Sequence, residues 1–214
     1  PGIRTAAGAF FDIKVIGKGG HGAFPQFAID PITIAAEIIS AIQTIISRAT
    51  SPNESAVLSI TKMHAGDAYN VIPEKAVLSG TVRTFTIEKM QEIEQQMVSI
   101  SEGISKAHGG TALVEFNTLF LPVLNEEEAT DLATEVCGEM VGRDNVITTG
   151  SAGTGSEDFS FMSNEVPGCY VIIGNGEDSN ALHNPNFDFN DEALVYGGSF
   201  FARVIEKELA LDQV

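Results

Sequence analysis

The sequence predicts an α/β fold made of two parts. Between residues 10 and 121 the strand and helix patterns follow the order β-α-β-β-α-β, which is typical of a ferredoxin-like sandwich. Two long segments in this region repeat apolar residues every three or four positions, as amphipathic helices do. After Pro122 only one convincing strand follows, which is too little for an independent α/β domain. We therefore expect a complete domain over 10–121 and a partial one made of 1–9 and 122–214.

The first half of the sandwich begins with a strand at residues 10–17, where the alternating pattern places Phe11, Ile13 and Val15 on one face. A helix follows, with Asp30 as its N-cap and Pro31 at its first position. Its apolar residues form two stripes. One stripe is Ile32, Ala35, Ile39, Ile42 and Ile46, and the other is Ile34, Ile38 and Ile45. A helix that is apolar on two sides is expected to pack on its own sheet and, through the second stripe, on a neighbouring subunit.

The second half of the sandwich is predicted from two strands, near 56–65 and 75–86, and a helix that Thr86 opens. The pair Gly109-Gly110 ends this helix, as a glycine C-cap does. A last strand is expected at 111–120, which completes the six elements.

The part after Pro122 is predicted to hold a helix near 126–142, a loop rich in glycine, serine and threonine, and a terminal helix over about 191–210. The apolar run Cys169–Ile173 indicates a buried strand between them. Because one strand cannot form a sheet, we expect this part to pack on sheet from sequence outside this chain. The chain also lacks an initiator methionine, which indicates a processed product or a piece of a longer protein.

The charge and composition limit the possible partners. The 29 acidic residues exceed the 12 lysines and arginines, giving a net charge of −17, so a nucleic acid partner is not expected. No apolar stretch reaches the roughly 18 residues of a membrane span, so no membrane partner is expected. Cys137 and Cys169 are isolated in the sequence, which fits a reducing cytoplasm.

Two histidines lie where chemistry is plausible. His21 stands among glycines in "GKGGHGAFP", where small residues permit a positive φ or the close approach of another chain. His183 precedes Asn-Pro in "ALHNPNFDF", which holds it in a defined turn. His21 could equally be a surface histidine, and His183 could be a metal ligand or an ordinary loop residue.

Three further residues are candidates for substrate contacts. Glu157 lies in "GSEDF" at the start of a short helix, where a carboxylate can face the helix dipole or line a cleft. In "NVIPEKAVLSGTVR", Asn70 precedes a strand and Arg83 lies near the far end of that strand. The alternation of that strand places Arg83 on the same face as Thr81, where it is either solvated or able to bind a carboxylate.

Five strings, taken in order, carry a resemblance to a known family: "GKGGHGAFP", "GDAYNVIPEKAVLSGTVRTF", "GSEDFSF", "VPGCYVIIG" and "LHNPNFDFND". They resemble the metal-dependent aminoacylase and carboxypeptidase family, in its amidohydrolase branch of hippurate hydrolase, N-acyl-amino-acid amidohydrolases and auxin-conjugate hydrolases. The resemblance implies a lid domain that mediates dimers and the C-terminal part of a catalytic α/β metallopeptidase domain. The family's N-terminal half, with its other metal ligands and its general-base glutamate, has no counterpart here.

The resemblance also implies a role for each candidate. His183 corresponds to the family's last metal ligand. His21 corresponds to the lid histidine that reaches across the dimer and stabilises the oxyanion. Asn70 and Arg83 correspond to lid residues that bind the substrate, Arg83 through its carboxylate, and Glu157 belongs to a segment lining the same cleft.

The predicted function is the metal-dependent hydrolysis of the amide bond of N-acyl-amino acids by a homodimer joined through its lid domains. Two divalent metals per complete site are implied, and zinc, manganese, cobalt and nickel all fit. This chain alone is expected to be inactive. The alternatives are a metallo-carboxypeptidase of the same family, a non-catalytic dimerisation module, and a small-molecule binding domain.

Overall fold

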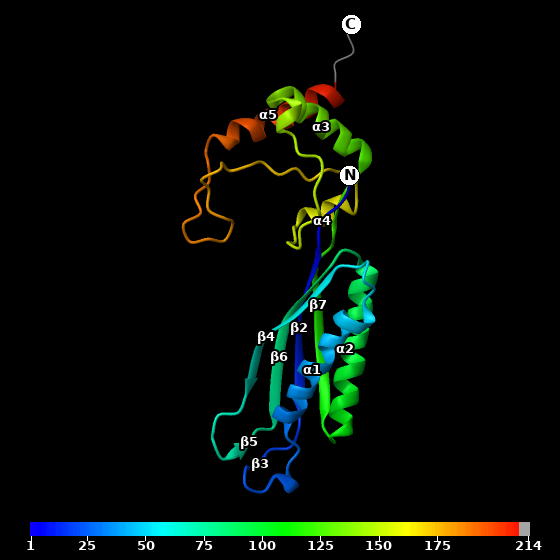
Figure 1. Ribbon diagram of the computed structural model, residues 1–214, viewed down its shortest axis with the longest axis vertical. Coiled ribbons are helices and arrows are strands. Elements are labelled where there is room, and N and C mark those ends of the chain that lie inside the picture. Colours follow the sequence, from blue (N-terminus) through cyan, green and yellow to red (C-terminus); the bar gives the residue numbers. More distant parts are fainter. Residues whose placement is uncertain (210–214) are drawn as a thin grey trace. The chain divides into compact units, whose positions relative to one another are not determined.

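The computed structural model describes residues 1–209, which form two compact units (Figure 1). The sandwich unit is made of Thr5–Val123 together with the later segment Ala152–Phe161. The C-terminal unit is made of Pro1–Arg4, Leu124–Ser151 and the described residues from Met162 onward. The sequence-based domain limits stay a prediction.

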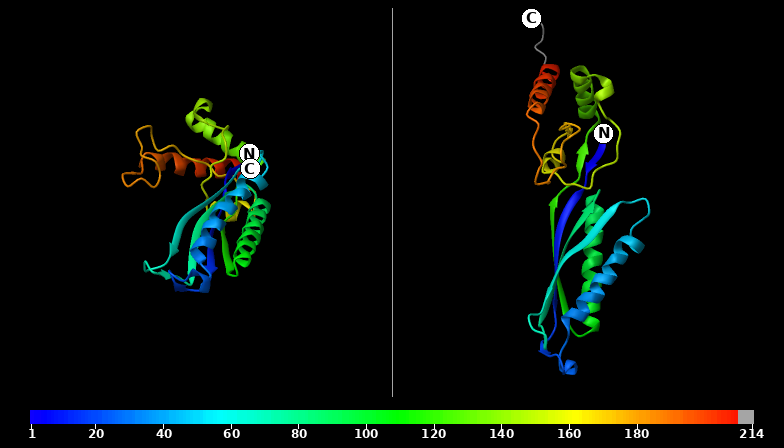
Figure 2. Two further views of the ribbon diagram at one scale, coloured as in Figure 1. Left: turned by 60° about the horizontal axis from the view of Figure 1, so that its bottom comes forward. Right: turned by 60° about the vertical axis from the view of Figure 1, so that its left-hand side comes forward.

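The sandwich unit contains one four-stranded antiparallel sheet in the order β4-β6-β2-β7. Its strands are β2 (Ala7–Ile16), β4 (Ala56–Ala65), β6 (Lys75–Thr84) and β7 (Thr111–Phe120). Two helices, α1 (Pro31–Ala49) and α2 (Ile87–Ala107), cover one face of the sheet (Figure 2). The order of elements along the chain is the predicted β-α-β-β-α-β.

The core lies between the sheet and the two helices. Phe11, Ile13 and Val15 are buried in it, as their alternation predicts. Gly80 stands opposite Phe11 on β6, and a Cβ there would lie 2.4 Å from the Phe11 ring. The Phe11 ring therefore takes the room that a side chain at position 80 would need, in the middle of the sheet.

The division of helix α1 into two stripes was wrong. Ile34, Ile38 and Ile45, which we expected to face a neighbouring subunit, are 0–1% exposed and lie in the core of their own sandwich. At about 100° per residue these positions share one helical face with Ala35 and Ile42, so the helix has a single wide core face. They are therefore not available to a partner.

Helix α1 also corrects the expectation that no apolar stretch has the length of a membrane span. By length and composition alone, α1 could cross a membrane. Its apolar face packs on the sheet instead, and the core helix of a globular domain passes the same test.

The ends of both helices are capped as their sequences predict. The Ile32 amide donates to Asp30 Oδ1 at 2.9 Å, and the Lys89 amide donates to Thr86 Oγ1 at 3.2 Å. Gly109 ends α2 with a φ of 81°, and the Gly110 amide donates to Ser105 O at 2.8 Å.

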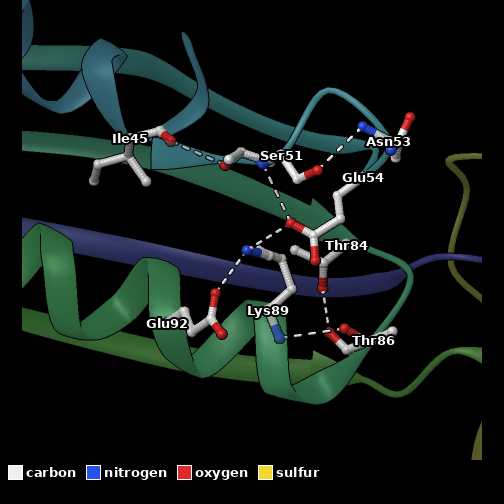
Figure 3. A network of polar contacts seen from close by, with 9 residues as sticks. Ile45, Ser51, Asn53, Glu54, Thr84, Thr86, Lys89 and Glu92 are labelled. Atoms are coloured by element: carbon white, nitrogen blue, oxygen red, sulfur yellow. Dashed lines mark hydrogen bonds and ion pairs between the residues drawn. The ribbon is translucent and has the colours of Figure 1, made fainter. Parts of the chain in front are cut away.

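A charged network joins the loop after α1 to the first turns of α2 (Figure 3). Lys89 Nζ lies 2.8 Å from Glu54 Oε2 in the loop and 2.6 Å from Glu92 Oε2 on α2. The hydrogen bond from Lys89 is the main cause that lowers the pKa of Glu54, and the same two carboxylates raise the pKa of Lys89. The network fixes the loop that leads into edge strand β4.

The C-terminal unit contains helices α3 (Glu127–Val141) and α5 (Ala193–Glu208). Lys207 of α5 joins the two helices by forming ion pairs with Glu135 and Glu139 of α3. A two-stranded ribbon pairs β1 (Gly2–Thr5) with β8 (Val123–Asn125). The terminal helix was expected to end near position 210, which lies outside the described residues.

The predicted buried strand Cys169–Ile173 was wrong. No strand forms there, and Ile172 is 78% exposed. The side chain of Asn125 holds the run instead, donating to Tyr170 O at 3.0 Å and accepting from the Tyr170 amide at 2.8 Å. A strand requires a neighbouring strand for its backbone hydrogen bonds, and residues 1–209 supply none to this run.

Candidate functional site

His21 and Asn70 lie together at one end of the sandwich. β3 (Gly20–His21) pairs with β5 (Val71–Ile72), and this short ribbon lies beyond the end of the sheet (Figure 1). His21 stands opposite Val71, and the Gly22 amide donates to Asn70 O at 2.8 Å. Two residues that are far apart in the sequence are thus neighbours, and both side chains are exposed.

The segment that carries His21, residues 17–29, which we call the His21 arm, is held at its base. The Lys18 amide donates to Ile29 O, and the Ile29 amide donates to Lys18 O, each at 2.9 Å. A Cβ on Gly17 would lie 2.1 Å from Ile29 O, so only glycine allows the two segments to come this close.

The glycines of the arm serve close packing rather than an unusual backbone conformation. None of Gly17, Gly19, Gly20 and Gly22 has a positive φ. A Cβ at Gly22 would lie 3.3 Å from Asn70 O, and one at Gly20 would lie 3.0 Å from the Ala28 Cβ. The arm is therefore a folded element that presents His21 in a defined position.

The imidazole of His21 is oriented by the turn that follows it. The Ala23 amide donates to His21 Nδ1 at 3.1 Å, so in the neutral ring the proton is on Nε2. The Phe24 amide donates to His21 O at 2.8 Å, and the Phe24 ring centroid lies 5.4 Å from that of His21. The exposed ring thus offers an N–H donor from Nε2.

Arg83 lies at the opposite end of the sheet. It pairs with Gly8 at the start of β2, whereas Lys75, eight residues earlier on β6, pairs with Ile16 at the end of β2. At about 3.3 Å per residue, Arg83 is about 26 Å from the end that carries His21 and Asn70. One chain therefore does not bring these candidates into a single site.

The guanidinium of Arg83 is held by uncharged groups. Arg83 Nη1 donates to Thr81 Oγ1 and, at 3.0 Å, to Val82 O, while its Cζ lies 5.9 Å from the centre of the Phe10 ring. The Thr81 hydroxyl in turn donates to Ala9 O at 3.1 Å. Within residues 1–209 no carboxylate pairs with Arg83, so this half-buried cation has donors left for an anion.

The "GSEDF" segment lies beside Arg83. Gly153 bridges to Thr5, and the Ala6 amide donates to Gly155 O at 2.9 Å. A Cβ on Gly8 would lie 2.7 Å from Ser156 Oγ and 3.2 Å from Arg83 Nη1, so both side chains come close to the same glycine.

Glu157 follows Ser156, is half-buried and directly precedes the turn into α4 (Phe159–Ser163). Its neighbour Ser156 lies near Gly8, as Arg83 does, and the role of Glu157 stays a prediction.

His183 lies in the C-terminal unit on an exposed turn. The Asn184 amide donates to Ala181 O at 3.1 Å, and His183 has a φ of 67°, the one positive φ of a residue other than glycine in the described chain. Such a conformation is uncommon outside glycine and is concentrated at functional positions. No group of three His, Cys, Asp or Glu side chains that could hold a metal occurs within residues 1–209, so His183 is a single candidate ligand.

Several contacts of the candidates were not foreseen from the sequence. The Ala23 amide donates a hydrogen bond to His21. The Phe10 ring lies beside the guanidinium of Arg83, and Gly8 leaves the space that this guanidinium approaches. Only Thr81 had a usable signal, because it lies two residues from Arg83 on one strand and therefore shares its face.

Comparison with known proteins assigns part of this chain to a class, the dimerisation domain of a peptidase. Residues 4–109 match the M20 peptidase dimerisation domain. The chain is 35% identical over 208 residues to hippurate hydrolase of Campylobacter jejuni, covering 97% of this chain and 54% of the relative. It is 36% identical over 195 residues to N-acetylcysteine deacetylase of Bacillus subtilis, covering 91% and 50%.

A solved structure of an M20 family peptidase is also similar to this chain. A dinuclear metal binding peptidase of the M20 family from Bacillus subtilis superposes with a TM-score of 0.75 at 30% identity, over 95% of this chain and 50% of that one. The chain belongs to the M20 peptidase family, whose members matched here include hydrolases. It spans about half the length of the curated relatives it matches.

Proposed function

We propose that this chain forms part of a metal-dependent amidohydrolase that cleaves the amide bond of N-acyl-amino acids. The observation that carries the proposal is the Nε2–H donor of His21 on a rigid, exposed arm, together with a guanidinium at Arg83 that lacks an acidic partner within residues 1–209. A neutral N–H donor suits a developing oxyanion, and a guanidinium suits a carboxylate. The names of the relatives agree with such a substrate.

In the proposed site, the two clusters of candidate residues come from two copies of the chain. His21 and Asn70 lie at the end of the sheet that is about 26 Å from Arg83, a separation longer than an N-acyl-amino acid of ordinary size. In a symmetric dimer the arm of one copy reaches the cleft in which the other copy places Arg83. Each substrate then contacts His21 and Asn70 of one subunit and Arg83 of the other.

The residues of this chain have separate tasks in the reaction. Arg83 binds the carboxylate of the amino acid and fixes the amide beside it. His21 Nε2 donates a hydrogen bond to the carbonyl oxygen as its negative charge grows, and Asn70 orients the amide from the same arm. Ser156 and Glu157 line the cleft next to Arg83.

His183 is proposed as one ligand of the divalent metals. Its exposed imidazole in a strained turn fits a metal ligand, but catalytic sites use three or more protein ligands, so the others must come from sequence outside this chain. When bound, the metals polarise the carbonyl and lower the pKa of a water molecule. A glutamate outside this chain would take the proton of that water.

The C-terminal unit is proposed to be the closing part of a catalytic α/β domain. The exposed Ile172 and Ile173, and the lack of any buried residue in α5, leave apolar surface for a sheet to cover. A carboxypeptidase of the same family, a dimerisation module without catalysis and a cytoplasmic location all stay predictions.

The proposal is tested by replacing His21 in the full-length, metal-loaded gene product. His21→Ala is expected to lower kcat by about 10²–10³, since one oxyanion donor contributes about 3–4 kcal/mol to the barrier, and to leave the metal content unchanged. His64→Ala, on exposed edge strand β4, is the matched control and should keep normal turnover. Near-normal turnover of His21→Ala on N-acyl-amino acids would overturn the role of His21.

A further inference from the structure

We propose that Phe24 determines which acyl group the enzyme accepts, and that its ring favours an aromatic or branched apolar acyl group over acetyl. This inference rests on the proposed function. The acyl group lies on one side of the scissile amide bond, and the carboxylate that Arg83 binds lies on the other side.

The turn that orients the imidazole of His21 also places the Phe24 ring. The Phe24 amide donates to His21 O at 2.8 Å, and the Phe27 amide donates to Phe24 O at 3.1 Å, so the backbone of Phe24 is tied on both sides. The rings of His21 and Phe24 are 5.4 Å apart and tilted by 51°. Phe24 nevertheless remains 54% exposed, so much of its ring faces outward beside the imidazole.

A substrate that accepts a hydrogen bond from His21 lies close to Phe24, whose ring centroid is 5.4 Å from that of the imidazole. The carbonyl oxygen lies about 2.9 Å from the donating nitrogen, and the carbonyl carbon carries the hydrocarbon part of the acyl group on one side and the amide nitrogen of the amino acid on the other. Arg83, from the other subunit, draws the amino-acid side toward itself. The acyl side is therefore the one that lies nearer the arm, within reach of the ring of Phe24.

The apolar surroundings fit this role. Val71, which lies opposite His21 on the neighbouring strand of the ribbon, and Tyr69, two residues before it, are also exposed, so the ribbon offers further apolar surface to the acyl group. An apolar wall distinguishes two acyl groups that differ by a single methylene by about 10-fold or more. An acetyl group is too short to gain much from it.

Phe27 provides the matched control. It lies in the same short turn, η1 (Pro25–Phe27), and is 70% exposed. Among the ring contacts of residues 1–209, none joins Phe27 to His21. A change at Phe27 alters the apolar surface of the arm without altering the wall beside the imidazole.

The test measures kcat/KM of the full-length, metal-loaded enzyme on N-benzoylglycine and N-acetylglycine. Phe24→Ala is expected to lower kcat/KM for the benzoyl substrate about 10-fold and to leave the acetyl substrate within about two-fold. Phe24→Leu should restore most of the loss, and Phe27→Ala should change neither value.

Several outcomes would overturn the inference while leaving the proposed function intact. They are an equal fall on both substrates, an unchanged ratio, a wild-type preference for N-acetylglycine, and dissociation of the Phe24→Ala dimer in sedimentation. Failure of the wild-type enzyme to hydrolyse any N-acyl-amino acid would instead defeat the proposed function, and this inference with it.

Discussion

The backbone amide of Ala23 determines what the imidazole of His21 can offer. A ring whose Nδ1 accepts a hydrogen bond carries its proton on Nε2 when neutral, and Nε2 is the nitrogen at the far side of the ring. A ring with the other tautomer would present a lone pair to a carbonyl oxygen and repel it. The amide therefore acts through His21, as a positioning group.

The tautomer can be observed directly in the 214-residue chain. Nitrogen-15 spectra of the imidazoles at alkaline pH should show His21 with its proton on Nε2. Ala23→Pro removes the amide donor and should introduce a fraction of the Nδ1–H form, while exposed His64 remains unchanged as a reference. A wild-type His21 that carries its proton on Nδ1 would contradict the assignment.

The chemical surroundings of single residues were only partly predictable. The face of Arg83 follows from the alternation of its own strand, so its contact with Thr81 could be anticipated. Phe10 and Ser156 come from segments far away in the sequence, and no local pattern indicates that Phe10 lies beside Arg83 or that Ser156 approaches the same glycine, Gly8. Contacts of this kind depend on the register between strands, which alternation alone does not specify.

At the scale of elements, the base of the His21 arm depends on the absence of a side chain at position 17. Gly17→Ala places a Cβ 2.1 Å from Ile29 O and must separate the two segments. We expect a loss of about 1–3 kcal/mol in the free energy of unfolding of the chain, measured with urea.

A second glycine provides the control for this experiment. A Cβ on Gly103 in α2 would meet nothing within 4 Å, so Gly103→Ala should stabilise the chain by about 0.5–1 kcal/mol. Equal stability of Gly17→Ala and the wild type would show that the arm is not packed as described.

The Glu54–Lys89 network gives the sandwich a dependence on pH. The hydrogen bond from Lys89 lowers the pKa of Glu54 below its ordinary value of 4.5, so the folded state binds this proton less tightly than the unfolded state. The stabilisation is present above pH 4.5 and is lost as the pH falls through the lower, folded value.

Glu54→Gln should therefore be less stable than the wild type near pH 7, and the difference should vanish in acid. Urea unfolding over this pH range measures the difference, and Glu102→Gln, exposed on the same helix α2 that carries Lys89, serves as the control. A difference that is constant from about pH 7 to about pH 3 would exclude the ion pair as its source.

Elements with strong local signals were predicted correctly, and one strand that has no partner within residues 1–209 was not. The caps at Asp30 and Thr86 and the glycine end of α2 are local, and all three are confirmed. The strand expected at Cys169–Ile173 needs a partner strand and does not form. The position of helix α1 was predicted correctly, but its core face was not. The two apolar stripes are adjacent on the helix and share one wide face that packs on the sheet.

At the scale of the whole molecule, the two units differ in how far their own helices bury apolar side chains. The sandwich closes its core with 18 buried residues from its own strands and helices. In the C-terminal unit, helix α5 buries none of its side chains. The partial domain that the sequence analysis expects from the number of strands after Pro122 stays a prediction.

The register between β2 and β6 has a genetic consequence. The arm of one subunit is proposed to serve the cleft of the other. In a hybrid dimer of one His21→Ala subunit and one Arg83→Ala subunit, one cleft then has both residues and the other cleft has neither. Random exchange of subunits between purified His21→Ala and Arg83→Ala enzymes should then recover about a quarter of wild-type turnover from two nearly inactive parents. Two alleles that each abolish growth on the substrate would complement in one cell, whereas residues that all serve their own subunit would leave the hybrid as inactive as its parents.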